Sequence, residues 1–190
     1  MFNISSPMHS IFWPKQQIYL KQAGLIILGS LLLSISAQLS IPLQPIPLTF
    51  QSASVILLAL IYGARLATAS VASYLLAGAC GLPVFADFHH GISVFMGPSA
   101  GYLGGFLPAA FITGYLAEKG FAKTIPLSFL AACVGAVIVF SFGISVLAKF
   151  TGWHNAWILG FKPFWFTELI KLAVIAVFVP FCWARKAHAN

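Results

Sequence analysis

Two oppositely charged residues stand close together inside an apolar segment near the end of the chain. Glu168 and Lys171 lie three positions apart in PFWFTELIKLAVIA, residues 163–176. In a helix this spacing places both side chains on one face. A charge within a membrane span costs at least about 2.5 kcal/mol, so such residues usually face a cavity or a partner. Two interpretations stay open here: an ion pair that satisfies itself, or a ligand site with one acidic and one basic contact.

A second group of reactive residues lies in GLPVFADFHHGISVFMGPSAGY, residues 81–102, which holds Asp87, His89 and His90. Its GPSAG segment matches the G-x-S-x-G pattern of serine hydrolases. A nucleophilic Ser99 would need a base and an orienting group beside it, and the histidines are only ten residues upstream in the same segment. We therefore expect Ser99 to cap a helix. A metal site would need further ligands from elsewhere, and we expect none.

Small residues form a patch in the first apolar segment. Gly29, Ser30 and Ser34 lie close in sequence, with the two serines four positions apart. Small residues at this spacing allow another helix to approach closely. The partner helix could belong to the same chain or to another subunit.

Composition assigns the chain to a broad class before any motif is considered. Of its 190 residues, 60% are hydrophobic and 7% are charged, whereas a soluble domain carries about 25% charged residues. The chain is therefore expected to be an integral membrane protein. Its net charge of +7 is expected to orient it in the membrane and not to bind nucleic acid. Three cysteines without metal-ligand spacing are interpreted as small packing residues.

Apolar segments predict an all-α protein with six transmembrane helices, because a spanning helix needs roughly 20 apolar residues. The expected spans are residues 20–40, 51–61, 66–80, 97–117, 125–147 and 164–183. The second is short, and it follows a proline-rich stretch, residues 41–51, that cannot form a regular helix. The polar region before the first span argues against a cleaved signal peptide. We expect one domain: an N-terminal segment (1–19), a six-helix bundle (20–183) and a tail (184–190).

The distribution of basic residues predicts the orientation. An even number of spans puts both termini on one side, together with Lys15, Lys21, Arg65, Lys119, Lys123, Arg185 and Lys186. The opposite side has only Lys149 and Lys162 in its loops. By the positive-inside rule, both termini are expected to be cytoplasmic in a multi-pass cell-membrane protein.

Four motifs in order resemble the BioY family, the biotin-specific substrate-binding S-components of energy-coupling-factor (ECF) vitamin transporters. They are SAQLSIPLQPIPLTFQ (36–51), GLPVFA (81–86), GPSAGYLGGF (97–106) and PFWFTELIK (163–171). The third is similar to the family's G-P-T-G-G-Y-L and the fourth to its P-F-x-x-x-D-x-x-K, with Glu168 where aspartate is usual. The family's loop often carries an arginine before the G-P segment. Here the corresponding stretch is DFHHG, with His89 in that place.

The resemblance implies a six-helix subunit with an outward-side pocket that captures biotin for uptake. It also implies a transmembrane coupling subunit and cytoplasmic ATPase subunits as partners, which alone use ATP. No Walker A motif occurs in this chain, and neither enzymatic activity nor a cofactor is expected. The residues expected to contact the ligand are Glu168, Lys171, Tyr74, Asp87, His89, Gln51 and Tyr102, and those expected to dock the coupling subunit are Gly29, Ser30 and Ser34.

The alternatives are an S-component for another small vitamin and an intramembrane serine hydrolase that uses Ser99. Gln44 and Thr49 are further candidates for polar contacts at the edge of the pocket, and Phe85 and Phe88 for its apolar cover. A ligand with the groups of biotin suits such a site, because it offers a carboxylate, two ureido N–H donors, a ureido oxygen and an apolar sulfur ring.

Overall fold

The fold is an all-helical bundle with one small hairpin. The computed structural model describes residues 18–187, and side chains within residues 19–182. The helices are α2 (Ile18–Gln38), α3 (Gln51–Tyr62), α4 (Ala64–Ala79), α5 (Ala100–Glu118), α6 (Ile125–Thr151), α7 (Trp153–Gly160) and α8 (Trp165–Ala187). Three short 3₁₀ helices, η2 (Ala86–Phe88), η3 (Ile92–Met96) and η4 (Phe121–Lys123), lie in the connections. The expected segment before residue 18 and the end of the tail lie outside the described residues.

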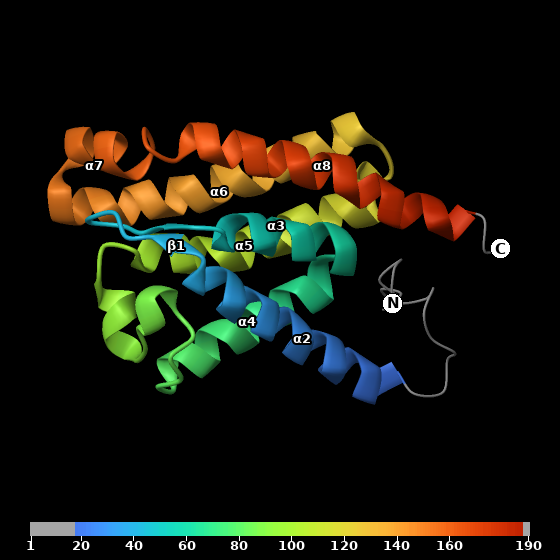
Figure 1. The fold of residues 1–190 in the computed structure, drawn as a ribbon, viewed down its shortest axis with the longest axis horizontal. Helices are drawn as coiled ribbons and strands as arrows, with labels where there is room; N and C mark the ends of the chain where they lie inside the picture. Colours follow the sequence, from blue (N-terminus) through green and yellow to red (C-terminus); the bar gives the residue numbers. More distant parts are fainter. Residues whose placement is uncertain (1–17, 188–190) are drawn as a thin grey trace.

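Six of the described helices run alternately between two ends of the molecule (Figure 1). These are α2, α3, α4, α5, α6 and α8. The start of α2 and the end of α8 lie at one end, which we call the terminal end. The hairpin, the segment 80–99 and α7 lie at the other, which we call the loop end. All of the long connections that could cover a site are therefore gathered at the loop end.

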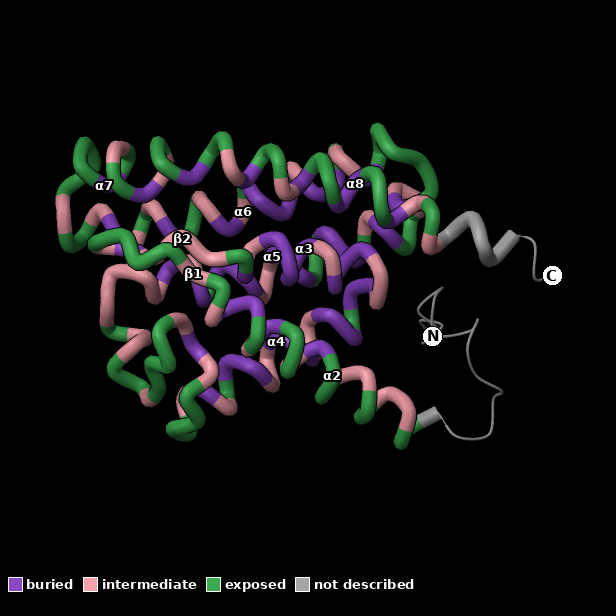
Figure 2. Tube along the Cα trace, in the orientation of Figure 1, coloured by how far each residue is buried: buried purple, intermediate pink, exposed green. Residues whose placement is uncertain are grey.

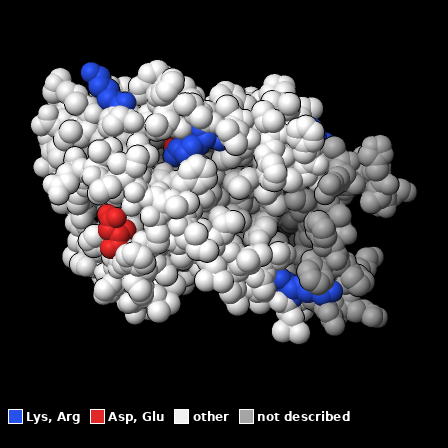
Figure 3. Space-filling model, in the orientation of Figure 1, with Lys and Arg blue, Asp and Glu red and all other residues white. Residues whose placement is uncertain are grey.

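Helix length and hydropathy make the chain a multi-pass membrane protein. Four helices in the described part of the chain are long and apolar enough to span a membrane: Tyr19–Gln38, Ala100–Glu118, Ile125–Thr151 and Trp165–Cys182. With 12 residues in α3 and 16 in α4, the two shorter helices fall below the roughly 20 residues of a regular span. Many apolar side chains point outward, including Ile27, Val137 and Phe178. Figure 3 shows that charged side chains are sparse on the face in view.

Small residues on α5 form its packing surface against α6. Gly101 and Gly105 are buried against α6, where added Cβ atoms would meet the Phe142 carbonyl oxygen and the Val139 backbone, respectively. Small side chains let the two helices approach closely. Figure 2 shows that buried residues lie on the sides of the helices that face the inside of the bundle.

The turn between the two short helices is held by a carboxylate. Gly63 adopts φ 80°, a left-handed conformation that suits glycine. The next residue, Ala64, donates its backbone N–H to Glu118 Oε1 at 2.9 Å. An acidic group is favourable at a helix N-terminus because the macrodipole is positive there. Glu118, at the end of α5, thus anchors the start of α4.

The proline-rich stretch forms an extended hairpin, in line with the prediction that it cannot be helical. Strands β1 (Ser40–Ile41) and β2 (Leu48–Thr49) pair antiparallel, with Ser40 opposite Thr49. Gln44–Pro45 in the connection is a cis peptide bond. The hairpin places β2 directly before α3, at the loop end.

One expected loop is largely helical. The loop expected between the spans 125–147 and 164–183 is mostly helical, because α6 continues to Thr151 and α7 follows after Gly152. Trp157 in α7 stacks on Phe161, the residue directly after this helix, with 4.5 Å between the ring centroids. The hydrophobic pattern of this segment resembles that of an interfacial loop because it mixes aromatic and polar residues in a short length.

Candidate ligand-binding site

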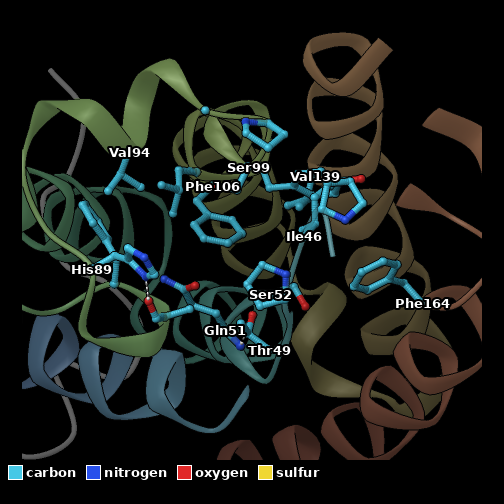
Figure 4. A pocket seen from close by; sticks show the side chains of 18 of the residues that line it. Ile46, Thr49, Gln51, Ser52, His89, Val94, Ser99, Phe106, Val139 and Phe164 are labelled. Carbon is cyan, nitrogen blue, oxygen red and sulfur yellow. Dashed lines mark hydrogen bonds between the residues drawn. The ribbon is translucent and has the colours of Figure 1, made fainter. Parts of the chain in front are cut away.

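A cavity of about 290 Å³ lies toward the loop end, between the hairpin, the segment 85–99, the first turns of α3, α5 and α8 and the middle of α6 (Figure 4). This volume is close to the lower end of the range for small-molecule sites. Its apolar lining includes Ile46, Phe85, Val94, Leu103, Phe106, Val139, Phe140 and Phe164. Its polar lining consists of Thr49, Gln51, Ser52, Asp87, His89, Ser99, Tyr102, Glu168 and Lys171. The cavity is therefore mostly apolar, with polar groups supplied by several elements.

Glu168 and Lys171 form an ion pair on the inner face of α8. Lys171 Nζ lies 2.5 Å from Glu168 Oε2. It also donates to the Thr49 carbonyl oxygen at 3.1 Å and to Ser52 Oγ at 3.2 Å. Ser52 Oγ in turn donates to Glu168 Oε2 at 3.0 Å. The pair is thus fixed to the end of the hairpin and the first turn of α3, and a lysine ammonium has three donors for these three contacts.

The second oxygen of Glu168 is the least satisfied polar atom of this network. Glu168 is 4% exposed, and its Oε1 is buried without a hydrogen-bond partner among the described residues. Buried polar atoms are nearly always paired, and an unpaired one costs about 1–3 kcal/mol. The site therefore holds a free acceptor beside an ammonium group, which suits a neutral N–H donor on a ligand. Both interpretations from the sequence stay open, because the ammonium is fully bonded within the protein while one oxygen of the carboxylate is not.

Tyr74 does not line the cavity, contrary to the expectation that it contacts the ligand. Its ring is fully buried because the inward face of α4 packs into the core below the site. Its hydroxyl accepts a hydrogen bond from Gln51 Nε2 at 2.5 Å, and its ring meets Phe85 edge-on at 5.4 Å between centroids. Gln51 and Phe85 do line the cavity. Tyr74 consequently supports two residues of the site from behind.

Tyr102 lies in the cavity wall. Its hydroxyl donates to the Gly160 carbonyl oxygen at 2.9 Å, and its ring meets Phe140 edge-on at 6.2 Å. Phe140 also makes an edge contact with Phe164, at 6.4 Å. These rings form an aromatic wall that joins α5, α6 and the start of α8.

The segment after α4 contributes Asp87 and His89 to the cavity. Asp87 Oδ1 accepts a hydrogen bond from Ser40 Oγ at 3.1 Å. His89 Nδ1 lies 2.8 Å from the Ala86 carbonyl oxygen. Because a carbonyl oxygen only accepts, this contact assigns the tautomer in which Nδ1 carries a proton. Figure 4 places His89 and Phe164 on opposite sides of the cavity.

The described residues form neither the hydrolase site nor the metal site that the G-x-S-x-G pattern and the histidine pair raised as possibilities. Ser99 lines the cavity, but its hydroxyl forms no hydrogen bond to His89 or His90 in the described part of the chain, and His90 Nδ1 instead lies 3.3 Å from the Phe88 carbonyl oxygen. Ser99 does precede α5, yet its side chain makes no capping bond. Among residues 18–187, no group of three or more His, Cys, Asp or Glu residues could hold a metal ion.

Other candidates divide between the cavity and its surroundings. Thr49 and Phe85 line the cavity, whereas Gln44 and Phe88 are exposed outside it. Ser52 was missed, although it bonds both charged residues of α8. Its position directly after Gln51, at the start of an apolar segment, was only a weak indication in the sequence that it belongs to the site. The phenylalanines of the aromatic wall carried no signal, because phenylalanine is frequent throughout the chain.

Gly29 packs inside the protein and is not available to a docking partner, contrary to the expectation for it. It is buried, and an added Cβ would lie 2.5 Å from Ser70 Oγ on α4. Ser30 and Ser34 are half-buried, and Ser34 Oγ donates to the Ser30 carbonyl oxygen at 2.9 Å. The close approach at Gly29 is therefore between α2 and α4 of the same chain.

Comparison with known proteins gives a consistent family. The sequence matches the model of the BioY family over residues 9–188. It is 41% identical to the biotin transporter BioY of Thermotoga maritima, over 77% of this chain and 86% of that protein. It is 36% identical to the probable biotin transporter BioY of Pyrococcus horikoshii, over 83% of this chain and 93% of that protein.

The fold has a solved counterpart. The S-component for biotin from an ECF-type ABC transporter superposes with a TM-score of 0.78 and 23% sequence identity, over 92% of this chain and 95% of that chain. At this identity the likeness establishes the fold, and the ligand must be argued from the site.

Proposed function

Because this chain belongs to the BioY family, we propose that it is the biotin-binding subunit of a membrane vitamin-uptake transporter and captures biotin in the cavity at its loop end. The observation that carries the proposal is Glu168 Oε1, which is buried beside the Lys171 ammonium and has no hydrogen-bond partner within the described part of the chain. A ureido group combines N–H donors with a carbonyl oxygen, and this pair offers an acceptor and a cation next to each other.

Glu168 accepts a ureido N–H in this proposal, and Lys171 binds either the ureido oxygen or the carboxylate. The ammonium reaches the ligand by exchanging a neutral protein contact, such as the one to the Thr49 carbonyl oxygen at 3.1 Å. A site built on buried polar groups rejects analogues that leave those groups unpaired. Selectivity for the ureido ring therefore follows from the same two residues.

The remaining lining completes the pocket. Phe106, Val139, Phe140 and Phe164 supply apolar contacts for the sulfur ring and the aliphatic chain, and burial of this kind provides most of the binding energy of such ligands. Gln51, Tyr102, Asp87 and His89 provide polar contacts at the edges, with Tyr74 supporting Gln51.

Six membrane crossings with the cavity on the outer side fit this role. The alternating course of the helices supports six crossings, and Ile46 and Thr49 of the hairpin line the cavity directly before the short α3. Non-helical backbone is tolerated at membrane depth where it is enclosed by protein or lines a cavity. Lys21, Arg65, Lys119 and Lys123 lie at the terminal end, so by the positive-inside rule that end is cytoplasmic.

Uptake requires partners in this proposal. A transmembrane coupling subunit docks on the outer face of α2, and cytoplasmic ATPase subunits hydrolyse ATP, since this chain carries no Walker A motif. The chain itself works as a transporter subunit in the lipid membrane, without a cofactor and without nucleic acid.

A second candidate is an S-component for another small vitamin. It is favoured by Glu168 in place of the family's aspartate and by DFHHG in the loop. A glutamate is one methylene longer, so its carboxylate stands further from the backbone of α8 than that of an aspartate, which changes the ligand that fits beside it.

Calorimetric titration of the purified protein in detergent, with biotin and with biotin methyl ester, separates these candidates. We expect biotin to bind well below micromolar concentration. A large loss with the ester would show that a charge such as Lys171 reads the carboxylate, and equal binding would place Lys171 on the ureido oxygen. A folded protein that does not bind biotin would contradict the proposal and lead to the same titration with other vitamins.

A further inference from the structure

The cavity wall formed by residues 85–89 has an unusual backbone. Asp87 adopts φ 56° and Phe88 adopts φ 59°. Aspartate tolerates the left-handed region better than most residues, but phenylalanine rarely occupies it. Such conformations persist only where the surrounding structure holds them in place. Since Phe85, Ala86, Asp87 and His89 all line the cavity, whatever holds this segment also shapes the site.

The side-chain amide of Gln38, the last residue of α2, bridges the segment from outside. Its Nε2 donates to the Phe85 carbonyl oxygen at 2.9 Å, and its Oε1 accepts from the Phe88 backbone N–H at 3.2 Å. The two contacts bracket Ala86 and Asp87. An amide is the neutral side chain that offers both a donor and an acceptor in one plane, so it can hold two backbone groups of a turn at once.

A second contact from the same region reinforces the bridge. Ser40 in β1, two residues after Gln38, donates its hydroxyl to Asp87 Oδ1 at 3.1 Å. The segment's own bonds are short-range: Phe85 N–H to the His89 carbonyl oxygen, and His89 N–H to the Ala86 carbonyl oxygen, both at 3.2 Å. The contacts from Gln38 and Ser40 therefore join the strained turn to a distant element.

We infer that Gln38 is a positioning residue for the ligand site: it holds the turn 85–89 in the conformation that closes one side of the cavity, although it does not line the cavity itself. Its effect on biotin rests on the proposed function, whereas its effect on the turn does not. A preorganised wall lowers the cost of ordering on binding, so loss of the bridge accelerates ligand release.

The test compares Gln38→Leu with Gln44→Leu. Leucine resembles glutamine in size but has no donor or acceptor, and Gln44 is an exposed glutamine of the hairpin connection that does not line the cavity. Amide hydrogen exchange of residues 85–90 is measured without ligand, followed by the biotin dissociation rate and the thermal midpoint. We expect Gln38→Leu to raise exchange in this segment and to accelerate release on the order of tenfold, because two modest hydrogen bonds are lost. Gln44→Leu should change neither, and the loss of two hydrogen bonds should lower the thermal midpoint of Gln38→Leu only modestly, with exchange outside residues 85–90 unchanged.

Gln38→Glu separates the two halves of the bridge. It keeps the acceptor for the Phe88 N–H but turns an oxygen toward the Phe85 carbonyl oxygen. Exchange at Phe88 should stay near that of the unaltered protein while release accelerates.

Local exchange equal to that of the Gln44→Leu control, or exchange that rises throughout the protein, would overturn the inference. If the unaltered protein does not bind biotin, the proposed function fails, and the exchange of residues 85–90 without ligand still decides whether Gln38 holds the turn.

Discussion

The side-chain amide of Gln51 donates a hydrogen bond to the Tyr74 hydroxyl at 2.5 Å, joining the first residue of α3 to the buried face of α4. Gln51 lines the cavity and Tyr74 does not. The hydrogen bond to Tyr74 fixes the orientation of the Gln51 amide. It therefore also determines which amide atoms face the cavity. A buried tyrosine thereby acts on the site without reaching it.

Tyr74→Phe should weaken biotin binding modestly. The substitution removes the acceptor of the Gln51 amide while keeping the ring that packs on Phe85. A net loss of about 0.5–1.5 kcal/mol is expected for one such hydrogen bond, which corresponds to a few-fold to roughly tenfold in affinity by calorimetry. Tyr115→Phe, at an exposed position near the terminal end, is the control and should bind as the unaltered protein does. Unchanged affinity for Tyr74→Phe would show that the Gln51 orientation is irrelevant to the ligand.

Lys171→Ala should weaken binding far more than folding. Loss of a charged hydrogen-bond partner costs about 1.5–3 kcal/mol, so we expect a decrease of roughly 10- to 100-fold in affinity for biotin. Lys162→Ala removes a cation that is exposed at the same end and should leave affinity unchanged.

A double variant decides whether the pair is only structural. Glu168→Gln combined with Lys171→Met removes both charges, so no uncompensated buried charge remains. We expect it to fold and to lose biotin binding. Normal binding by the folded double variant, together with an unfolded Lys171→Ala, would show that the ion pair only holds the helices together.

Gly143→Ala should displace the Tyr102 ring. An added Cβ at this buried position of α6 meets the ring carbons of Tyr102, whose hydroxyl is fixed to Gly160. Overpacking of this kind costs typically about 1–3 kcal/mol, so both the thermal midpoint and biotin affinity should fall. Gly104→Ala is the matched control, because its added Cβ meets nothing within 4 Å, and it should be neutral or slightly stabilising. A Gly143→Ala protein with normal stability and affinity would contradict this packing.

Ser30→Leu or Ser34→Leu should block assembly with the coupling subunit while sparing biotin binding. Both serines are half-buried on α2, and a bulky side chain there would prevent close approach of a partner helix. Co-purification with a tagged coupling subunit measures assembly, and calorimetry measures binding. Ser145→Leu, at an exposed serine of α6, should leave both unchanged. Loss of binding with intact assembly would be evidence against the docking role.

Gly29 is expected to behave differently from these serines. A side chain at this position would clash with Ser70 on α4, so Gly29→Leu should lower the thermal midpoint of the isolated subunit. Gly24→Leu, where an added Cβ meets nothing within 4 Å, should not. A stable Gly29→Leu protein that fails only in assembly would restore Gly29 to the docking surface.

Much of the fold could be predicted because its signals are local. The scarcity of charge predicted a membrane protein, and apolar runs bounded by polar residues predicted where the helices lie. Pro42, Pro45 and Pro47 predicted a non-helical connection, since proline lacks a backbone donor and fixes φ. The helix after Gly152 was missed because a short aromatic and polar segment has no clear period.

The contact between Glu168 and Lys171 was predicted correctly because helical spacing was sufficient, while their role toward a ligand stays a prediction. Glu168 and Lys171 share a face at any position of a helix, so their proximity could be inferred from two letters of the sequence. Tyr74 and Gly29 were misplaced because the sequence shows that a face turns inward without showing what it meets there.

The sequence by itself determined the membrane class, the order of the helices, the extended connection and the paired charges of the last helix, because each depends on residues that are neighbours along the chain. The tertiary structure alone decided that Ser52 completes the charged network, that Tyr74 stands behind Gln51, and that Gln38 holds the turn at Asp87. Those contacts join residues between 23 and 119 positions apart, and their geometry is fixed only when the helices pack against one another.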